Sequence, residues 1–521
     1  MAAPQVSSAA HDCALITTTR GTQPDDGHQP EYGRVGLLRS MRLFMTVQTS
    51  SRSRGYLERL GAYGFGPQES VILAALVTRD PLLLIGRSGT GKTFLLNSIS
   101  EALRLAHRHY NASLISFDDL VGFPYPDDNK TSVRFLETPA TVWGAESVLI
   151  DEISRCKPEH QNRLFSLVHE RKVQGLPLDS LRYRWAAMNP CGADTAGGEE
   201  YLGSEPLDAA LADRFAVIID VGDWDALTDD DRRRIANPAG EGVTADDDGA
   251  LASAIDAWRA TFERAAEQCP PQVLEYVTAI TTTLRSSHIR VSPRRTRLLT
   301  RTLLAALIVE YGHAEQFTTT RAKTLFREVL ECSLPHRAWG ETVNLDAVRA
   351  AHELAWNGSM LEGPALWLYR LHLEPTLDGK ATLLMRHCPD RDSGSIAVEQ
   401  LLANETKARA AAFALAAFPA AVAGRLPVGA EAVNDLGRAA QPLLTVSGDV
   451  TWQERYSDQN TTHPELTRYG QVLAQLTDAR RKRAEQLFSY CAVQRLDVPD
   501  ADAFEQEFNR CLAVFSPETD R

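Results

Sequence analysis

The sequence predicts an α/β core, built as a parallel sheet with flanking helices, followed by a helical lid and a mostly α-helical C-terminal region. Two observations carry this prediction. Between residues 56 and 219, short apolar runs alternate with segments of helical periodicity, which is typical of parallel strands joined by helices. From residue 250 onward the pattern is helical, and the last part of the chain is alanine-rich without a fixed-period repeat.

The composition is that of a globular chain large enough for several domains. Of its 521 residues, 44% are hydrophobic and 24% are charged, and the net charge of −13 argues against a protein that coats nucleic acid. The eight cysteines form no C-x-x-C pair, which fits a reducing compartment, so we expect a cytoplasmic protein. No apolar run approaches the roughly 18 residues of a membrane helix, so we expect no membrane insertion.

The chain divides into four predicted regions. Residues 1–45 are polar, rich in turn-forming residues and without periodicity, so we expect a disordered tail. The α/β domain is assigned to residues 46–222, the helical lid to 223–315 and a mostly helical region of unknown role to 316–521. The lid begins with clustered aspartates, which we interpret as a solvated connection or helix start rather than a metal site.

The first strand is predicted at residues 82–85, an apolar run that leads into a glycine-rich loop. The loop matches the pattern G-x-x-x-x-G-K-[ST] and consists of Gly86, Arg87, Ser88, Gly89, Thr90, Gly91, Lys92 and Thr93. Its glycines let backbone N–H groups close around a phosphate, Lys92 can reach the β- and γ-phosphates, and the Thr93 hydroxyl can bind Mg²⁺. A helical pattern follows from Phe94, so the phosphate would meet a helix N-terminus. The sequence therefore predicts a site for ATP and Mg²⁺.

A second apolar strand, at residues 147–150, ends in two adjacent carboxylates, Asp151 and Glu152. Asp151 would hold Mg²⁺, usually through a water molecule, and Glu152 would orient and polarise the water that attacks the γ-phosphate. A kinase that phosphorylates a hydroxyl group does not need the second acid, whereas a hydrolysing enzyme does. The pair therefore favours ATP hydrolysis.

A third strand, at residues 183–188, ends in Asn189, and Pro190 stops it. In a parallel sheet, residues that contact ligands gather at the carboxyl ends of the strands. We therefore expect Asn189 to lie beside the γ-phosphate and to help fix the attacking water.

Two arginines complete the set of candidate catalytic residues. Arg214 ends a short helical pattern just before the apolar run 216–219, and arginine is suited to stabilising charge on a transferring phosphoryl group. Arg294 follows Ser292, a candidate N-cap, and Pro293, a candidate first helical residue. A cation at a helix start is disfavoured unless an anion is near, so this position indicates phosphate contact. The alternative is a solvated basic helix.

In this order, the five motifs resemble those of the AAA+ ATPases and, among them, the MoxR-like group. The resemblance covers residues 60–311 and makes them Walker A, Walker B, sensor 1 (Asn189), arginine finger (Arg214) and sensor 2 (Arg294). The segment "DEISRCKPEHQNRLFSLVHERKVQG" looks like the MoxR helix and hairpin, with Ser154 where an asparagine is expected. The segment "FDDLVGFPYPDDNKTSVRFLETPATVW" looks like the insert in helix 2, whose two short strands face a ring pore.

The resemblance implies a hexamer with ATP between subunits that remodels, activates or loads a protein client. Such clients often carry a von Willebrand factor A domain, and this chain has no D-x-S-x-S signature of its own. One alternative is a DNA-acting motor of the restriction type, which Lys130 and Arg134 in the insert would suit, although Asp127 and Asp128 lie beside them. Another is a nucleotide-gated scaffold in which the C-terminal region does the binding.

Overall fold

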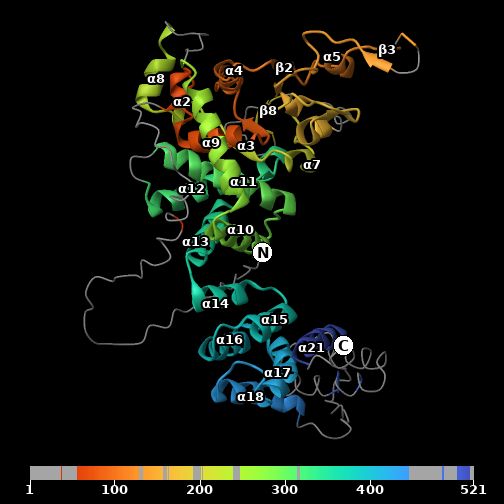
Figure 1. Ribbon diagram of the computed structural model, residues 1–521, viewed down its shortest axis with the longest axis vertical. Helices are drawn as coiled ribbons and strands as arrows, with labels where there is room; N and C mark the ends of the chain where they lie inside the picture. Colours follow the sequence, from red (N-terminus) through yellow and green to blue (C-terminus); the bar gives the residue numbers. More distant parts are fainter. Residues whose placement is uncertain are drawn as a thin grey trace, which may run out of the picture.

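The computed structural model describes residues 37, 55–126, 128–129, 133–156, 161, 164–191, 201, 203–238, 247–313, 317–444, 481, 484–485 and 501–516. Figure 1 shows the α/β part at one end of the molecule and a stack of short helices at the other, with α10 and α13 between them. The predicted α/β core with a mostly helical C-terminal part is confirmed.

The α/β part is built on a five-stranded parallel sheet with the strand order β2-β5-β8-β1-β9. Its strands are β1 (Leu82–Ile85), β2 (His107–Asn111), β5 (Ser147–Asp151), β8 (Tyr183–Met188) and β9 (Val217–Asp220). Every residue of β1 and β8 is buried, as is usual for central strands of a parallel sheet. The phosphate loop follows β1, the Asp-Glu pair ends β5 and Asn189 follows β8, so all three lie at one edge of adjacent strands.

Short helices and two antiparallel hairpins surround this sheet. The helical elements are α2 (Tyr56–Arg59), η1 (Gly66–Gln68), α3 (Glu69–Thr78), α4 (Lys92–Ala102), α5 (Phe117–Val121), η2 (Ile153–Arg155), η3 (Ser166–Glu170), α7 (Ala209–Ala212) and η4 (Trp224–Ala226). One hairpin pairs β3 (Pro124–Pro126) with β4 (Val133–Phe135), and the other pairs β6 (Lys172–Val173) with β7 (Leu176–Pro177). Both lie in segments where the sequence predicts a hairpin, and the β3 hairpin forms the outer end of the α/β part in Figure 1.

The helices that follow the sheet are α8 (Asp229–Ile235), α9 (Ala250–Glu267), α10 (Pro271–Ser286), α11 (Pro293–His313), α12 (Thr319–Glu331) and α13 (Leu345–Ser359). Helix α11 packs against α3 and α9, and α10 packs against α13. Their buried side chains join those on one face of the sheet in an apolar cluster that reaches from Leu37 to Trp356. The other face of the sheet packs in a separate cluster that includes Ile150 and Met188. Three of the clustered aspartates form the first turn of α8, where Thr228 caps the helix and the helix dipole favours negative charge.

A second apolar cluster, from Trp367 to Phe515, holds the C-terminal helices together. These helices are α14 (Gly363–Leu373), α15 (Leu377–His387), α16 (Arg391–Asn404), α17 (Lys407–Val422), α18 (Ala430–Leu444) and α21 (Ala501–Phe515). The small alanine side chains of α17 let α18 and α21 pack closely against it. None of the helices in the described ranges combines the length and the apolar character needed to cross a membrane.

The packing divides the helices at a different place from the predicted boundary between residues 315 and 316. Helices α12 and α13 belong to the cluster that includes the sheet, whereas α14 is the first helix of the second cluster. We therefore propose that the C-terminal unit begins between α13 and α14.

One residue of the predicted tail, Leu37, is 1% exposed in the first cluster, and the rest of residues 1–45 lie outside the described residues.

The segment between α12 and α13 returns to the sheet. We call residues 332–341 the strap; it includes the turn η6 (His336–Trp339). The backbone N–H of Ile218 in β9 donates a hydrogen bond to the carbonyl of Cys332 at 2.7 Å. The chain that leads to the C-terminal helices thus lies along an outer strand of the α/β core.

Candidate nucleotide site

The phosphate loop and the ends of β5 and β8 line one cavity of about 310 Å³. Nine residues predicted from the sequence line it: Ser88, Gly89, Thr90, Gly91, Lys92, Thr93, Asp151, Glu152 and Asn189. Gly86 and Arg87 precede them in the same loop. The cavity thus brings together side chains that are up to about a hundred residues apart in the sequence, as the convergence of parallel strand ends predicts.

Glycines are required at three positions by the shape of the loop. Gly89 and Gly91 each have a φ of 82°, in the left-handed region that favours glycine. A Cβ atom on Gly86 would lie 2.9 Å from the Cβ of Val221 and 3.0 Å from Thr90 Oγ1. Helix α4 begins at Lys92, within the last residues of the loop, so its first backbone N–H groups are available to an anion held there.

The Lys92 side chain is only 7% exposed and is held by the loop itself. Its Nζ donates to the carbonyl oxygens of Gly86 and Arg87, both at 2.7 Å, and lies 3.4 Å from Asn189 Oδ1. Burial lowers the pKa of Lys92, and the nearby carboxylates of the Asp-Glu pair oppose this effect. The ammonium group therefore lies at the cavity wall, where phosphate oxygens could replace the carbonyl groups.

The Asp151 carboxylate is fixed by hydrogen bonds at both oxygens. Thr93 Oγ1 donates to Oδ2 at 2.9 Å, His109 Nε2 lies 3.3 Å from the same oxygen, and the Glu152 N–H donates to Oδ1 at 2.9 Å. Burial raises the pKa of Asp151, but the hydrogen bonds from His109, Thr93 and the Glu152 backbone outweigh it and keep the pKa below its usual value. A hydroxyl and an ionised carboxylate side by side are the hard oxygen ligands that Mg²⁺ prefers.

Glu152 has an unusual backbone conformation for a residue with a side chain. Its φ of 55° and ψ of 38° place it in the left-handed region, and it forms an ion pair with Arg155 at 2.6 Å. Left-handed backbone conformations raise the energy of residues other than glycine, and they are found most often at functional sites. The conformation turns the chain sharply after β5, so that the half-buried Glu152 side chain lines the cavity beside Asp151.

Arg214 and Arg294 do not belong to the cavity lining; they lie around Asp213. Asp213 accepts hydrogen bonds from Ser292 Oγ at 3.0 Å and pairs with Arg294 at 3.2 Å. The predicted cap is confirmed, because Ser292 Oγ also accepts from the Arg295 N–H at 3.0 Å. Asp213 therefore supplies an anion for Arg294 at the helix start, and the predicted contact of Arg294 with a phosphate stays a prediction.

The Arg214 side chain lies over the ring of Phe165, with 4.5 Å from Cζ to the ring centre, and donates to the carbonyl of Ala210. Its Nε atom is buried and has no hydrogen-bond partner among the described residues. The pKa of Arg214 is lowered mainly by burial, and the positive charge of Arg294 lowers it further. The two guanidinium groups are thus close enough to repel each other.

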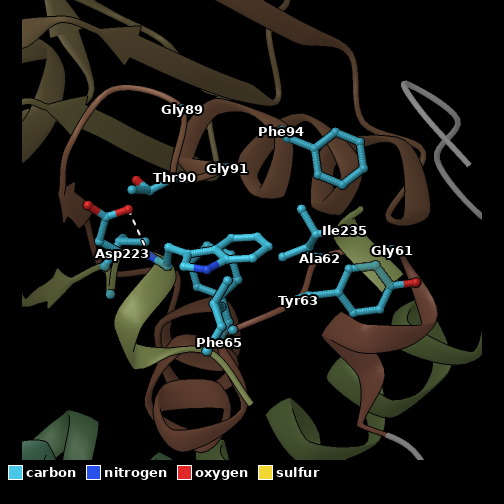
Figure 2. Close-up of a pocket in the computed structure, with 15 residues that line it drawn as sticks. Gly61, Ala62, Tyr63, Phe65, Gly89, Thr90, Gly91, Phe94, Asp223 and Ile235 are labelled. Atoms are coloured by element: carbon cyan, nitrogen blue, oxygen red, sulfur yellow. Dashed lines mark hydrogen bonds between the residues drawn. The ribbon is translucent and has the colours of Figure 1, made fainter. Parts of the chain in front are cut away.

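A second cavity, of about 200 Å³, adjoins the phosphate loop (Figure 2). It shares Gly89, Thr90, Gly91 and Phe94 with the first cavity. Figure 2 shows Phe94, Tyr63 and Ile235 around it, and Phe65, Trp224 and Leu227 also line it. A pocket with aromatic walls beside a phosphate site suits the flat, apolar face of a purine base.

The sequence reasoning missed this second pocket and two neighbours of the Asp-Glu pair, His109 and Arg155. The sequence contains only weak signals for the pocket and for these two residues. Tyr63 and Phe65 alternate with glycines just before α3, and Trp224 comes shortly after β9, behind Val221, Gly222 and Asp223. A polar residue such as His109 on a strand beside the Asp-Glu strand is a further signal, visible only once the strand order is known.

A known family model matches the part of the chain that contains this cavity. Residues 81–215 match the family model of the AAA domain of the dynein-related subfamily, a segment that contains the whole phosphate cavity and Arg214 but not Arg294. A solved structure from Cytophaga hutchinsonii, named a "putative ATPase", is similar at 18% identity, with a TM-score of 0.40, over 63% of this chain and 94% of its own. No curated protein matches the chain. The α/β part is thus similar to AAA domains, and the MoxR-like subgroup stays a prediction.

Proposed function

We propose that this chain is an AAA+ ATPase that binds ATP with Mg²⁺ and hydrolyses it at the subunit interfaces of a homo-oligomeric ring. By resemblance to the MoxR-like group the ring is a hexamer, and its task is to remodel, activate or load a protein client in a reducing cytoplasm. The observation that carries the proposal is the single cavity lined by the phosphate loop, the Asp-Glu pair and Asn189, within a segment similar to AAA domains.

Each side chain in the cavity has a role that its position supports. Bound ATP with Mg²⁺ would supply the transferable phosphoryl group and a cation that offsets its charge. Lys92 and the loop N–H groups would hold the phosphates, and Thr93 and Asp151 would hold the cation. Glu152 would accept a hydrogen bond from a water molecule and orient it for attack, and Asn189 would fix the same water.

The arginine cluster supports a site shared between subunits. Arg214 and Arg294 lie outside the cavity of their own subunit and face the repulsion of their like charges. Such a cluster would be stabilised by an anion that another molecule brings to it. We propose that this anion is the ATP phosphate of the neighbouring subunit, with Arg214 as the residue that stabilises the transition state.

A protein client is favoured over DNA by the β3–β4 hairpin. Phe123, Tyr125 and Leu136 are 63%, 44% and 51% exposed and lie in this hairpin or directly beside it, where the Leu136 N–H donates to the carbonyl of Phe123 at 2.9 Å. Exposed apolar patches mark contacts with other proteins, whereas a DNA surface needs clustered basic residues. The client class that the resemblance implies is a protein with a von Willebrand factor A domain.

The proposal is tested with the purified full-length chain by measuring ATP turnover, ATP binding and the ATP-dependent mass of the assembly. Glu152→Gln should keep binding, lower turnover by about 10²-fold or more and trap the ATP-bound oligomer. Glu137→Gln, an exposed carboxylate outside the cavity, is the matched control and should behave as wild type. Equal turnover of wild type and Glu152→Gln would overturn the proposed chemistry.

The same assay separates the alternatives. Stimulation of turnover by DNA but not by a protein client would favour the DNA motor. ATP-dependent assembly without turnover in the wild type would favour the nucleotide-gated scaffold.

A further inference from the structure

We infer that the strap, residues 332–341, is a positioning element for Arg214, and that Ala338 is its central contact. This inference rests on the proposed function, in which Arg214 acts at the site of a neighbouring subunit. The need for such an element follows from the short helix that precedes Arg214. Helix α7 has 4 residues, too few to keep a fixed orientation through its own hydrogen bonds.

The strap supplies a contact that holds this segment. The backbone N–H of Leu207, just before α7, donates to the carbonyl of Ala338 at 2.9 Å. Ala338 is fully buried in the apolar cluster on one face of the sheet, which includes Ile150 and Met188, and Trp339 packs against that cluster. The turn η6 also packs against α7 itself.

The same part of the strap reaches the end of strand β8. Cys191 Sγ lies 4.0 Å from the carbonyl oxygen of Ala338, two residues after Asn189. Pro190 and Cys191 share a small cavity with Arg337 and Gly340 of the strap. Ala338 therefore lies between Asn189, which lines the nucleotide cavity of its own subunit, and the segment that presents Arg214.

Helix α11 holds the segment from another direction. The guanidinium group of Arg295, which is 2% exposed, donates to the carbonyl oxygens of Ala212, Phe215 and Ala216. Between α7, the α10–α11 connection and the strap lies a cavity of about 780 Å³. Because this side of α7 is not filled by side chains, the contact at Ala338 has a large influence on where Arg214 lies.

The strap also leads directly into the helical part. It is followed by α13, which packs against α10, and then by α14, the first helix of the second cluster. A displacement of these helices would therefore be transmitted through the strap to α7. A movement of the helical part would thus change the position of Arg214 and, with it, the rate of hydrolysis.

The test is the Ala338→Leu variant of the full chain, whose larger side chain would push the strap away from Leu207. We expect ATP turnover to fall about 10-fold to 100-fold, as for small misplacements of catalytic groups, while the Kd for ATP changes less than about twofold. The matched control is Ala412→Leu, an equally buried alanine of α17 in the second cluster. It should lose a similar amount of thermal stability without the loss of turnover.

A double-mutant cycle shows whether the effect passes through Arg214. If it does, Ala338→Leu should lower turnover in the wild type but cause no further loss in the Arg214→Ala background. Additive losses would overturn the inference. No effect of Arg214→Ala itself would refute the shared active site instead, so the two failures are distinguishable.

A second variant decides the matter if Ala338→Leu does not fold. Arg337 of the strap is 54% exposed and pairs with Asp220 at the end of β9 at 2.7 Å. Because exposed ion pairs contribute little to stability, Arg337→Ala should fold normally. We expect its turnover to fall about twofold to fivefold with unchanged ATP binding; turnover equal to that of the wild type would overturn the inference.

Discussion

Replacing Lys92 by methionine tests the phosphate site most directly. Lys92 is buried, so an alanine would leave a cavity in the loop, whereas methionine keeps the apolar stem and removes only the ammonium group. In the structure this group makes two hydrogen bonds of 2.7 Å to loop carbonyls. In the ATP complex we expect these two donors to face the β- and γ-phosphates.

The magnitude follows from the two hydrogen bonds. A hydrogen bond to a charged group contributes about 1.5–3 kcal/mol, so two such bonds contribute about 3–6 kcal/mol to ATP binding. Since each 1.4 kcal/mol is about tenfold in affinity, Lys92→Met should raise the Kd for ATP by about 10²-fold to 10⁴-fold.

Titration calorimetry or a fluorescent nucleotide would measure the Kd of both proteins. Lys172→Met, an exposed lysine of β6, is the matched control and should bind ATP as the wild type does. An unchanged Kd for Lys92→Met would refute the assignment of the phosphate loop, provided that the variant keeps the thermal stability of the wild type.

Three further predictions concern the arginine, the second pocket and the response to pH. Arg214→Ala subunits mixed with Lys92→Ala subunits should regain turnover that neither has alone, because some interfaces then pair an intact site with an intact arginine; absence of rescue would argue against a shared site. Trp224→Ala should weaken binding of ATP up to about tenfold but leave binding of inorganic triphosphate unchanged, as competition assays would show, whereas equal losses would contradict a base pocket. Burial lowers the pKa of His107 and of His352 to about 4, so the unfolded chain takes up protons first as the pH falls below 6.5. The unfolding free energy, measured with denaturant, should therefore be constant above that pH and fall between 6.5 and 4; a flat profile would contradict the burial of these rings.

The loop, the Asp-Glu pair and Asn189 could be placed from the sequence because each follows a short apolar run directly. Their side chains meet because β5, β8 and β1 are neighbours in the sheet. The alternation of strands and helices predicts that the sheet is parallel, whereas the order of its strands is known only from the structure. The fold class was predictable for the same reason, since periodicity is a local property.

The features that escaped prediction depend on contacts between distant residues. The partner of Arg294 is Asp213, from the end of α7, and no periodicity relates the two positions. The second pocket combines Tyr63, which precedes the first strand of the sheet in the sequence, with Trp224, which follows the last strand. Likewise, α12 and α13 are amphipathic helices, as are α18 and α21 of the C-terminal region, so only packing reveals which cluster each helix joins.

The hydrogen bond between Ile218 and Cys332 has a consequence for the stability of fragments. Strand β9 is an outer strand of the sheet, and outer strands expose backbone groups that can pair with another chain and cause aggregation. The strap lies along this apolar strand and takes up one of its N–H groups. A fragment that ends after α11, where the lid was predicted to end, would leave β9 uncovered. We therefore expect that a well-behaved ATPase fragment must extend at least through the strap, to residue 341.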